Sequence, residues 1–89
     1  MKSHLDPAFL KLYRELPNQI RQQARKTCQL WKSDPAHPSL HFKCVNPRID
    51  AYSVRVGQAW RAVGFKSNDT IIWYWIGSHT DYDRLLKKL

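Results

Sequence analysis

The fold is decided by residues 52–76, which read YSVRVGQAWRAVGFKSNDTIIWYWI. Runs rich in Val, Ile, Phe, Tyr and Trp are separated by polar breaks at residues 57–58 and 67–69. Such runs, with a period of two, predict short strands joined by turns. We therefore expect antiparallel strands over residues 52–56, 60–66 and 71–76. Because the last run is apolar on both faces, it should lie inside the sheet and not at its edge.

Two helices are predicted upstream of these strands. Asp6 followed by Pro7 is a typical helix start, since Asp accepts hydrogen bonds from free amide groups and Pro fits the first turn. Apolar residues at helical spacing then predict a helix over residues 6–16. Pro17 interrupts it and opens a second helix with its own apolar face. The proline-rich segment 33–38 ends that second helix.

A further strand over residues 40–45 and a short C-terminal helix complete the prediction. Residues 78–81 read SHTD, which fits the capping box that opens a helix. Apolar residues from Tyr82 to Leu89 then recur at i, i+3, i+4 and i+7. The order helix, helix, four strands, helix indicates an α+β fold class.

The length and charge restrict the function. A chain of 89 residues is the size of one domain, residues 1–89, which excludes a multi-domain enzyme or a large cofactor-binding fold. Fifteen Lys and Arg against seven Asp and Glu give a net charge of +8, spread over both halves of the chain. A folded domain this basic is typical of proteins that meet nucleic acid, an acidic partner, or both. The alternative is a charge that only keeps the protein soluble.

The cysteines and the hydrophobic pattern indicate a cytoplasmic protein. Two cysteines are too few for a disulfide framework, and we find no signal peptide or apolar run of transmembrane length. The CxxC spacing of zinc sites is missing and two prolines intervene, which argues against a metal bound by Cys28, His37, His41 and Cys44. We therefore expect neither a metal nor another cofactor.

Two arginines in the predicted sheet are the first candidates for a functional site. No GxGxxG, GxxxxGK[ST], HExxH or GxSxG motif is present, so dinucleotide, P-loop, zinc-protease and α/β-hydrolase chemistry have no support. Strand alternation places Arg55 on the face opposite Val54. Arg61 shares a face with Val63 and Phe65, so its guanidinium must meet an anion or several carbonyl groups. It is either a phosphate clamp or a structural arginine that pairs with Asp50, Asp81 or Asp83.

His79 and Tyr82 are candidates at the start of the last helix. The positive end of the helix dipole favours the neutral imidazole of His79, which could then serve as a base. A histidine that only packs against Tyr82 fits the pattern equally well. Tyr82 also begins the apolar stripe of this helix, which favours a core position for its ring.

Three segments together resemble the RelE/ParE superfamily of bacterial toxins: LHF at residues 40–42, YSVRVGQAWRAVG at 52–64 and IIWYWIGSHTDYDRLL at 71–86. The resemblance implies a helical hairpin packed on a twisted four-stranded antiparallel sheet, with a first strand supplied by residues 1–5 or absent. It also implies an acidic antitoxin that wraps the toxin. Members of the RelE branch cleave messenger RNA in the ribosomal A site, and members of the ParE branch poison DNA gyrase.

The resemblance also assigns roles to individual residues. Arg61 matches the arginine that ribonuclease members place on the scissile phosphate, and Arg55 matches the arginine that closes the preceding strand. His79 lies where nuclease members carry a basic or imidazole side chain. Tyr82 lies near their C-terminal aromatic residue, as a stacking platform or proton donor. We further expect RNA contacts from the basic residues Lys43, Arg48 and Lys66.

One departure from the family pattern leaves the activity open. Where some nucleases of the family carry lysines, this chain has Ala51 and Ser53, so His79 would be the base or the acid. The leading hypothesis is a metal-independent, ribosome-dependent endoribonuclease, an mRNA interferase. The missing lysines favour a non-enzymatic gyrase inhibitor like ParE instead, whereas His79 favours the nuclease. An inactive member that only binds antitoxin is the third alternative.

Overall fold

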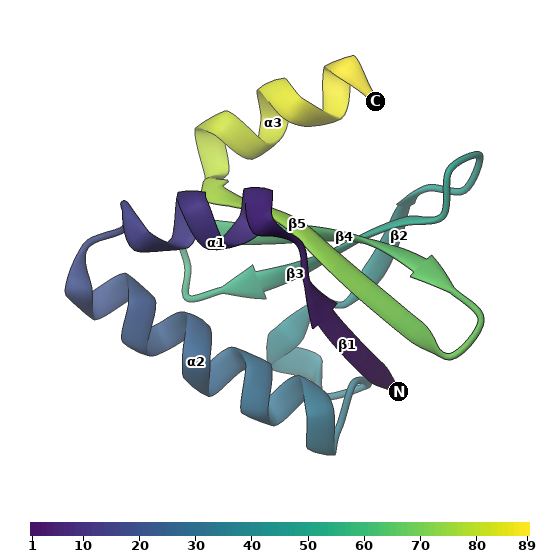
Figure 1. The fold of residues 1–89 in the computed structure, drawn as a ribbon, viewed down its shortest axis with the longest axis horizontal. Helices are drawn as coiled ribbons and strands as arrows, with labels where there is room; N and C mark the ends of the chain where they lie inside the picture. The colour runs from purple at the N-terminus through teal and green to yellow at the C-terminus, as the bar shows by residue number, and fades with distance from the viewer.

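The fold combines three α-helices with one mixed sheet, in a computed structural model that describes all residues 1–89 (Figure 1). Along the chain the elements are β1 (Lys2–Leu5), α1 (Pro7–Arg14), α2 (Asn18–Ser33), the 3₁₀ turn η1 (Pro38–Leu40), β2 (Lys43–Asn46), β3 (Ala51–Val56), β4 (Trp60–Ser67), β5 (Thr70–Ser78) and α3 (His79–Lys88). The α+β class is confirmed, as is the order of the three helices.

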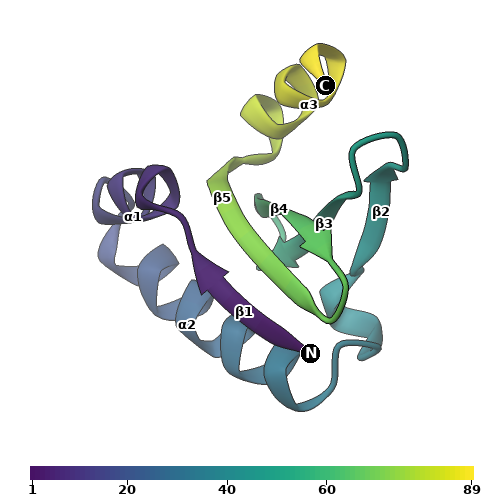
Figure 2. The same cartoon turned by 45° about the vertical axis from the view of Figure 1, so that its right-hand side comes forward.

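The prediction of a four-stranded antiparallel sheet is wrong. The sheet has five strands in the order β1-β5-β4-β3-β2, and β1 runs parallel to β5, from Lys2 opposite Thr70 to Leu5 opposite Trp73 (Figures 1 and 2). The backbone N–H of Lys2 donates to the carbonyl of Asp69 at 2.8 Å, so this pairing is carried by main-chain groups. With β1 on its outer side, β5 lies inside the sheet as predicted.

Local signals place the helix starts accurately. Asp6 accepts a hydrogen bond from the backbone N–H of Ala8 at 2.9 Å, and Ser78 accepts one from the N–H of Asp81 at 3.2 Å. The strand predicted over 40–45 begins later, at Lys43, because residues 38–40 form the 3₁₀ turn η1. The caps made by the side chains of Asp6 and Ser78 satisfy amide groups that a helix cannot bond internally.

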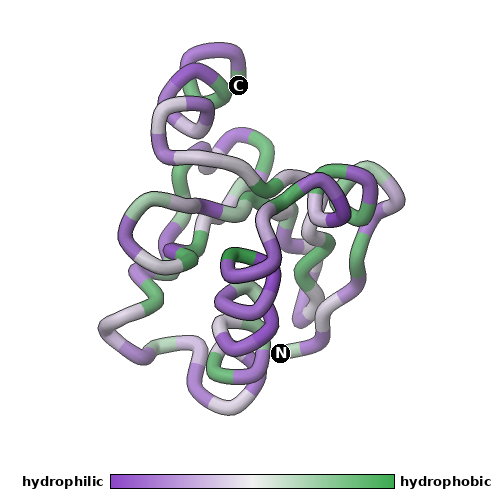
Figure 3. Tube along the Cα trace, turned by 90° about the vertical axis from the view of Figure 1, so that its left-hand side faces the viewer, coloured by the Kyte–Doolittle hydropathy of each residue, from purple (hydrophilic) through white to green (hydrophobic).

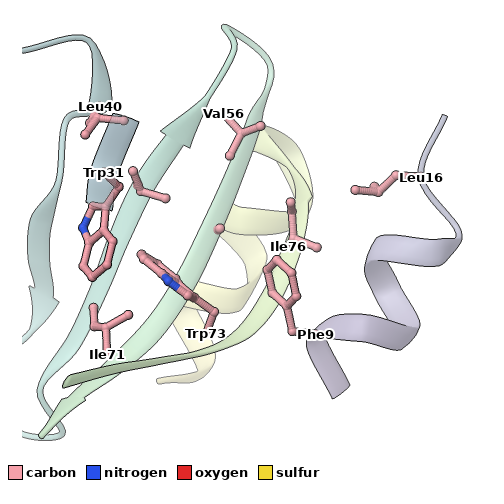
Figure 4. Packing of buried hydrophobic residues seen from close by; sticks show 10 residues of the cluster. Phe9, Leu16, Trp31, Leu40, Val56, Ile71, Trp73 and Ile76 are labelled. Atoms are coloured by element: carbon pink, nitrogen blue, oxygen red, sulfur yellow. The ribbon is translucent and has the colours of Figure 1, made fainter. Parts of the chain in front are cut away.

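The core lies between the helical hairpin α1–α2 and one face of the sheet (Figures 2 and 4). Trp31 of α2 is 1% exposed and meets Trp73 of β5 edge-on, with 5.6 Å between ring centroids. In Figure 3 the helical turns alternate between hydrophilic and hydrophobic colours, as amphipathic helices do. The buried cluster comprises Phe9, Leu16, Trp31, Leu40, Val54, Val56, Ala62, Ile71, Trp73 and Ile76. No helix has the length and apolar character needed to cross a membrane.

The opposite face of the sheet carries α3. Val54 belongs to the core, so the side chains of Ser53 and Arg55 on either side of it point to this second face. Tyr82 of α3 reaches Ser53 there, and its hydroxyl donates a hydrogen bond to Ser53 Oγ at 2.9 Å. Alternation along β3 therefore separates the core from a polar surface beneath α3.

Candidate functional site

A polar pocket of about 480 Å³ lies on this second face, between α3 and strands β2, β3 and β4. The polar side chains around it are His41, Lys43, Ser53, Arg55, Arg61, His79, Tyr82 and Asp83. An apolar cavity of about 290 Å³ lies on the other side of the sheet, beneath the helical hairpin. Because that cavity is lined almost entirely by hydrophobic residues, we take the polar pocket as the candidate site.

Two of the residues that line the pocket are arginines on neighbouring strands. Arg55 on β3 and Arg61 on β4 are direct cross-strand partners. Like charges in such positions destabilise a sheet. Arg61 Nη1 donates to the carbonyl oxygens of Gln58 at 3.2 Å and Trp60 at 2.7 Å, and Arg55 Nε donates to that of Gly57 at 3.1 Å.

No carboxylate neutralises this pair. The two ion pairs of the structure join His79 to Asp83 and Arg84 to Asp81, so Arg61 pairs with none of the three aspartates considered above. Burial lowers the pKa of Arg61, and the charge of Arg55 lowers it further, against opposing effects of Tyr82 and Asp83. The carbonyl interactions add no negative charge, so the pair keeps the charge and the N–H donors that binding of an anion would need.

His79 occupies the first position of α3 and is held from two sides. Its backbone N–H donates to the carbonyl of Ala59 at 2.8 Å, which ties the helix start to the β3–β4 turn. Its Nδ1 lies 3.2 Å from Asp83 Oδ2, and its side chain is 49% exposed. Since an ionised carboxylate only accepts hydrogen bonds, Nδ1 carries the proton in this contact and Nε2 is left open. Sequence analysis missed this role for Asp83, although the i, i+4 spacing signals it.

Tyr82 lines the pocket from a buried position. The residue is 6% exposed, and its hydroxyl is engaged by Ser53, which is 2% exposed. Its ring meets the imidazole of His79 edge-on at 5.9 Å between centroids. This packing fixes α3 on the sheet and leaves little of the ring for stacking with a base. A catalytic role for Tyr82 stays a prediction.

The three basic residues predicted to contact RNA are spread over the molecule. Lys43 lies at the pocket. Arg48 lies in the β2–β3 turn, where its backbone N–H donates to Asn46 Oδ1 at 3.1 Å. Lys66 lies over the ring of Tyr52 at 5.5 Å from its centroid, which places it on the hairpin side of the sheet. Of the three, only Lys43 shares a pocket with the arginine pair.

The structure also brings one unpredicted histidine into the pocket. His41 follows η1, and its Nε2 lies 3.4 Å from Arg55 Nη1. Sequence analysis considered His41 only as a zinc ligand, and no group of three His, Cys, Asp or Glu side chains is placed to hold a metal ion. The contact with Arg55 depends on the path of the η1–β2 connection, which no local pattern indicates.

A comparison with known protein families identifies the family of this chain. A family model described as the ParE-like toxin domain matches residues 18–84. The chain belongs to the RelE/ParE family of toxins. The match includes α2, the four antiparallel strands and most of α3, and therefore all the polar residues of the candidate site.

Solved structures support the same toxin fold at low sequence identity. The RelB–RelE antitoxin–toxin complex from Methanococcus jannaschii has a chain 21% identical to this toxin, with a TM-score of 0.71 over 90% of this chain and 95% of that one. The isolated E. coli RelE toxin is 17% identical, with a TM-score of 0.64 over 99% and 98% of the two chains. A copper-bound mutant toxin from Helicobacter pylori is 17% identical, with a TM-score of 0.61 over 91% and 97%. No curated protein sequence matches this toxin.

Proposed function

We propose that this toxin, a single domain over residues 1–89, is a metal-independent, ribosome-dependent endoribonuclease that cleaves messenger RNA in the cytoplasm. The observation that supports it is the uncompensated pair of Arg55 and Arg61 beside the imidazole of His79, which Asp83 orients. An anion site next to an oriented imidazole suits cleavage of a phosphodiester.

The geometry suits attack by a ribose 2′-hydroxyl on the adjacent phosphate. Arg55 and Arg61 would bind the scissile phosphate and stabilise the charge that develops on its oxygens. His79 would transfer one proton through its open Nε2, while Asp83 keeps Nδ1 protonated. Only RNA carries the 2′-hydroxyl, so the substrate class follows from the reaction. Tyr82 would act by holding α3, and so His79, in place.

The positive charge of the protein favours binding of a long RNA and of an acidic partner protein. The net charge of +8 favours the RNA backbone, and Lys43 lies at the pocket, where it can contact a neighbouring phosphate. Arg48 and Lys66 would contact RNA or the ribosome farther from the cleaved bond. The similar M. jannaschii toxin was crystallised with its antitoxin RelB. We propose that this toxin likewise forms a hetero-oligomer with an acidic antitoxin.

Inhibition of DNA gyrase without catalysis is the second candidate function. Ala51 and Ser53 stand where some nucleases of the family carry lysines; they are 0% and 2% exposed and offer no cationic side chain to an RNA phosphate. The family model that matches is also that of the ParE-like domain. On this alternative the arginines would be contact residues for a protein surface.

The experiment that decides between these functions is induction of the toxin in bacteria without antitoxin, with separate pulse-labelling of translation and DNA synthesis. We expect translation to fall first. Purified toxin should then cleave messenger RNA on ribosomes, and Arg61→Ala and His79→Ala should each lower the rate about 100-fold or more. Arg84→Gln is the matched control, because this arginine of α3 is exposed and makes its ion pair outside the pocket.

Each alternative has its own result in this experiment. An early block of DNA synthesis would support the gyrase inhibitor. A protein that inhibits neither process, but still binds antitoxin, would be the inactive member. Both results would overturn the ribonuclease proposal, as would full cleavage by Arg61→Ala.

A further inference from the structure

His41 adopts a backbone conformation that few residue types accept. It caps the end of η1 in the left-handed region, with φ of 47° and ψ of 40°. Residues other than glycine are uncommon there; this chain has three, His41, Asp50 and Asn68, and of these only His41 lines the polar pocket. The side chain is exposed and lines the polar pocket, so the conformation is not required by packing in the core.

The contact between His41 and Arg55 defines which imidazole nitrogen is free of a proton. Arg55 Nη1 lies 3.4 Å from His41 Nε2. An arginine has donors only, so this contact is a hydrogen bond when Nε2 offers its lone pair, that is, in the tautomer with the ring proton on Nδ1. His79 has the opposite arrangement, because its Nδ1–H faces the carboxylate of Asp83, which can offset the charge of an imidazolium.

The order of the strands places the two imidazoles on opposite sides of the arginine pair. His79 follows the end of β5, Arg61 lies on the adjacent β4, Arg55 lies on β3, and His41 precedes β2 at the far edge. Transfer at phosphorus requires the attacking and leaving oxygens to lie roughly in line through the phosphorus atom. A phosphate bound by the two arginines would therefore have one imidazole near each of these oxygens.

We propose that His41 is the general base of the cleavage reaction, with His79 as the general acid; this inference rests on the proposed ribonuclease function. Nε2 of His41 takes the proton of the 2′-hydroxyl as the O2′–P bond forms. The P–O5′ bond breaks, and the protonated His79 gives its Nε2 proton to the leaving O5′. The products are a 2′,3′-cyclic phosphate and a 5′-hydroxyl end.

Arg55 links substrate binding to the availability of this base. In this structure its Nη1 faces His41 Nε2 at 3.4 Å, where it can donate to the Nε2 lone pair. A phosphate between the two arginines would draw the guanidinium away, because a charge-assisted hydrogen bond to phosphate is stronger than one to a neutral ring. The base is then released only when a phosphate is bound.

The test is cleavage of messenger RNA on ribosomes by the full-length variants His41→Asn and His41→Gly. Asn and Gly both accept the left-handed conformation, so the backbone of the η1–β2 connection is kept. The control is His4→Asn on β1, an exposed histidine outside the pocket. We expect both His41 variants to be about 100-fold slower or worse, with unchanged melting temperatures, and His4→Asn to match the wild type.

Added imidazole provides a second readout that a structural role would not produce. It should restore cleavage to His41→Gly, where it can occupy the vacated space, and have no effect on His4→Asn. If the wild type cleaves and His41→Asn is within threefold of it, the assignment of His41 is overturned while the ribonuclease function stands. If the wild type does not cleave ribosome-bound messenger RNA, the proposed function fails, and the role of His41 fails with it.

Discussion

The hydrogen bond between Tyr82 and Ser53 allows a quantitative prediction that separates support from catalysis. The two hydroxyls are 2.9 Å apart, and both residues are buried. Tyr82→Phe removes the donor but keeps the ring, so we expect a loss of about 1 kcal/mol in the free energy of unfolding. For a domain of this size, 1 kcal/mol lowers the melting temperature by about 4–8 °C.

A double-mutant cycle isolates the bond itself. Ser53→Ala leaves the buried Tyr82 hydroxyl without an acceptor, which costs about 1–3 kcal/mol. Removing both hydroxyls leaves no unpaired group, so the double variant should lose less than the sum of the single losses, by about 1 kcal/mol. Urea unfolding followed by tryptophan fluorescence measures this directly, since the chain has four Trp.

The same variants test the function of Tyr82. Because its hydroxyl is engaged by Ser53, Tyr82→Phe should retain ribosome-dependent cleavage within a few-fold of the wild-type rate at a temperature where it is folded. Additive losses of stability in the cycle would refute the hydrogen-bond reasoning. A stable Tyr82→Phe protein that cleaves about 100-fold more slowly would instead identify Tyr82 as a proton donor.

Three further predictions concern the core, the sheet and the α3 start. Trp31→Ala should cost about 3–5 kcal/mol in urea unfolding because it empties the centre of the core, and a loss below 1 kcal/mol would contradict this packing. Burial raises the pKa of Tyr74 above 10.0, so its contribution to stability is complete below pH 10.0 and is lost as the pH rises further. The stability of Tyr74→Phe should therefore depend less on pH above pH 10.0 than that of the wild type. An unchanged slope of stability against pH in this range would contradict the raised pKa. Ser78→Ala should cost about 1 kcal/mol in thermal unfolding through loss of the α3 cap, whereas Ser67→Ala, at an exposed position that ends β4, serves for comparison.

The sequence predicts the elements whose signals are local. The starts of α1 and α3 follow from Asp6 and Ser78, whose side chains make the caps that their spacing predicts. The alternation of β3 places Arg55 on the face away from the core, as the structure confirms. These features depend on neighbours within a few residues of each other, so the pattern contains the necessary information.

Features that depend on distant contacts could not be predicted in the same way. Strand β1 has no alternating apolar pattern, because it is a four-residue edge strand of which three residues are exposed. His41 enters the pocket through a 3₁₀ turn and one left-handed residue, and its partner Arg55 lies 14 positions later. The pairing of His79 with Asp83 is different, because it is local and its i, i+4 spacing is visible in the sequence.

The parallel pairing of β1 with β5 has a consequence for the order of synthesis. The first strand made has no partner until Thr70–Ser78 has been translated, since β5 is its only neighbour in the sheet. His79 and Asp83 follow still later, so a nascent chain holds both arginines before it holds the acid that would act with them. Chains are synthesised from the N-terminus, and pairings between segments that are distant in the sequence form slowly. The candidate site can therefore form only after α3 has been made, however early the two arginines are in place.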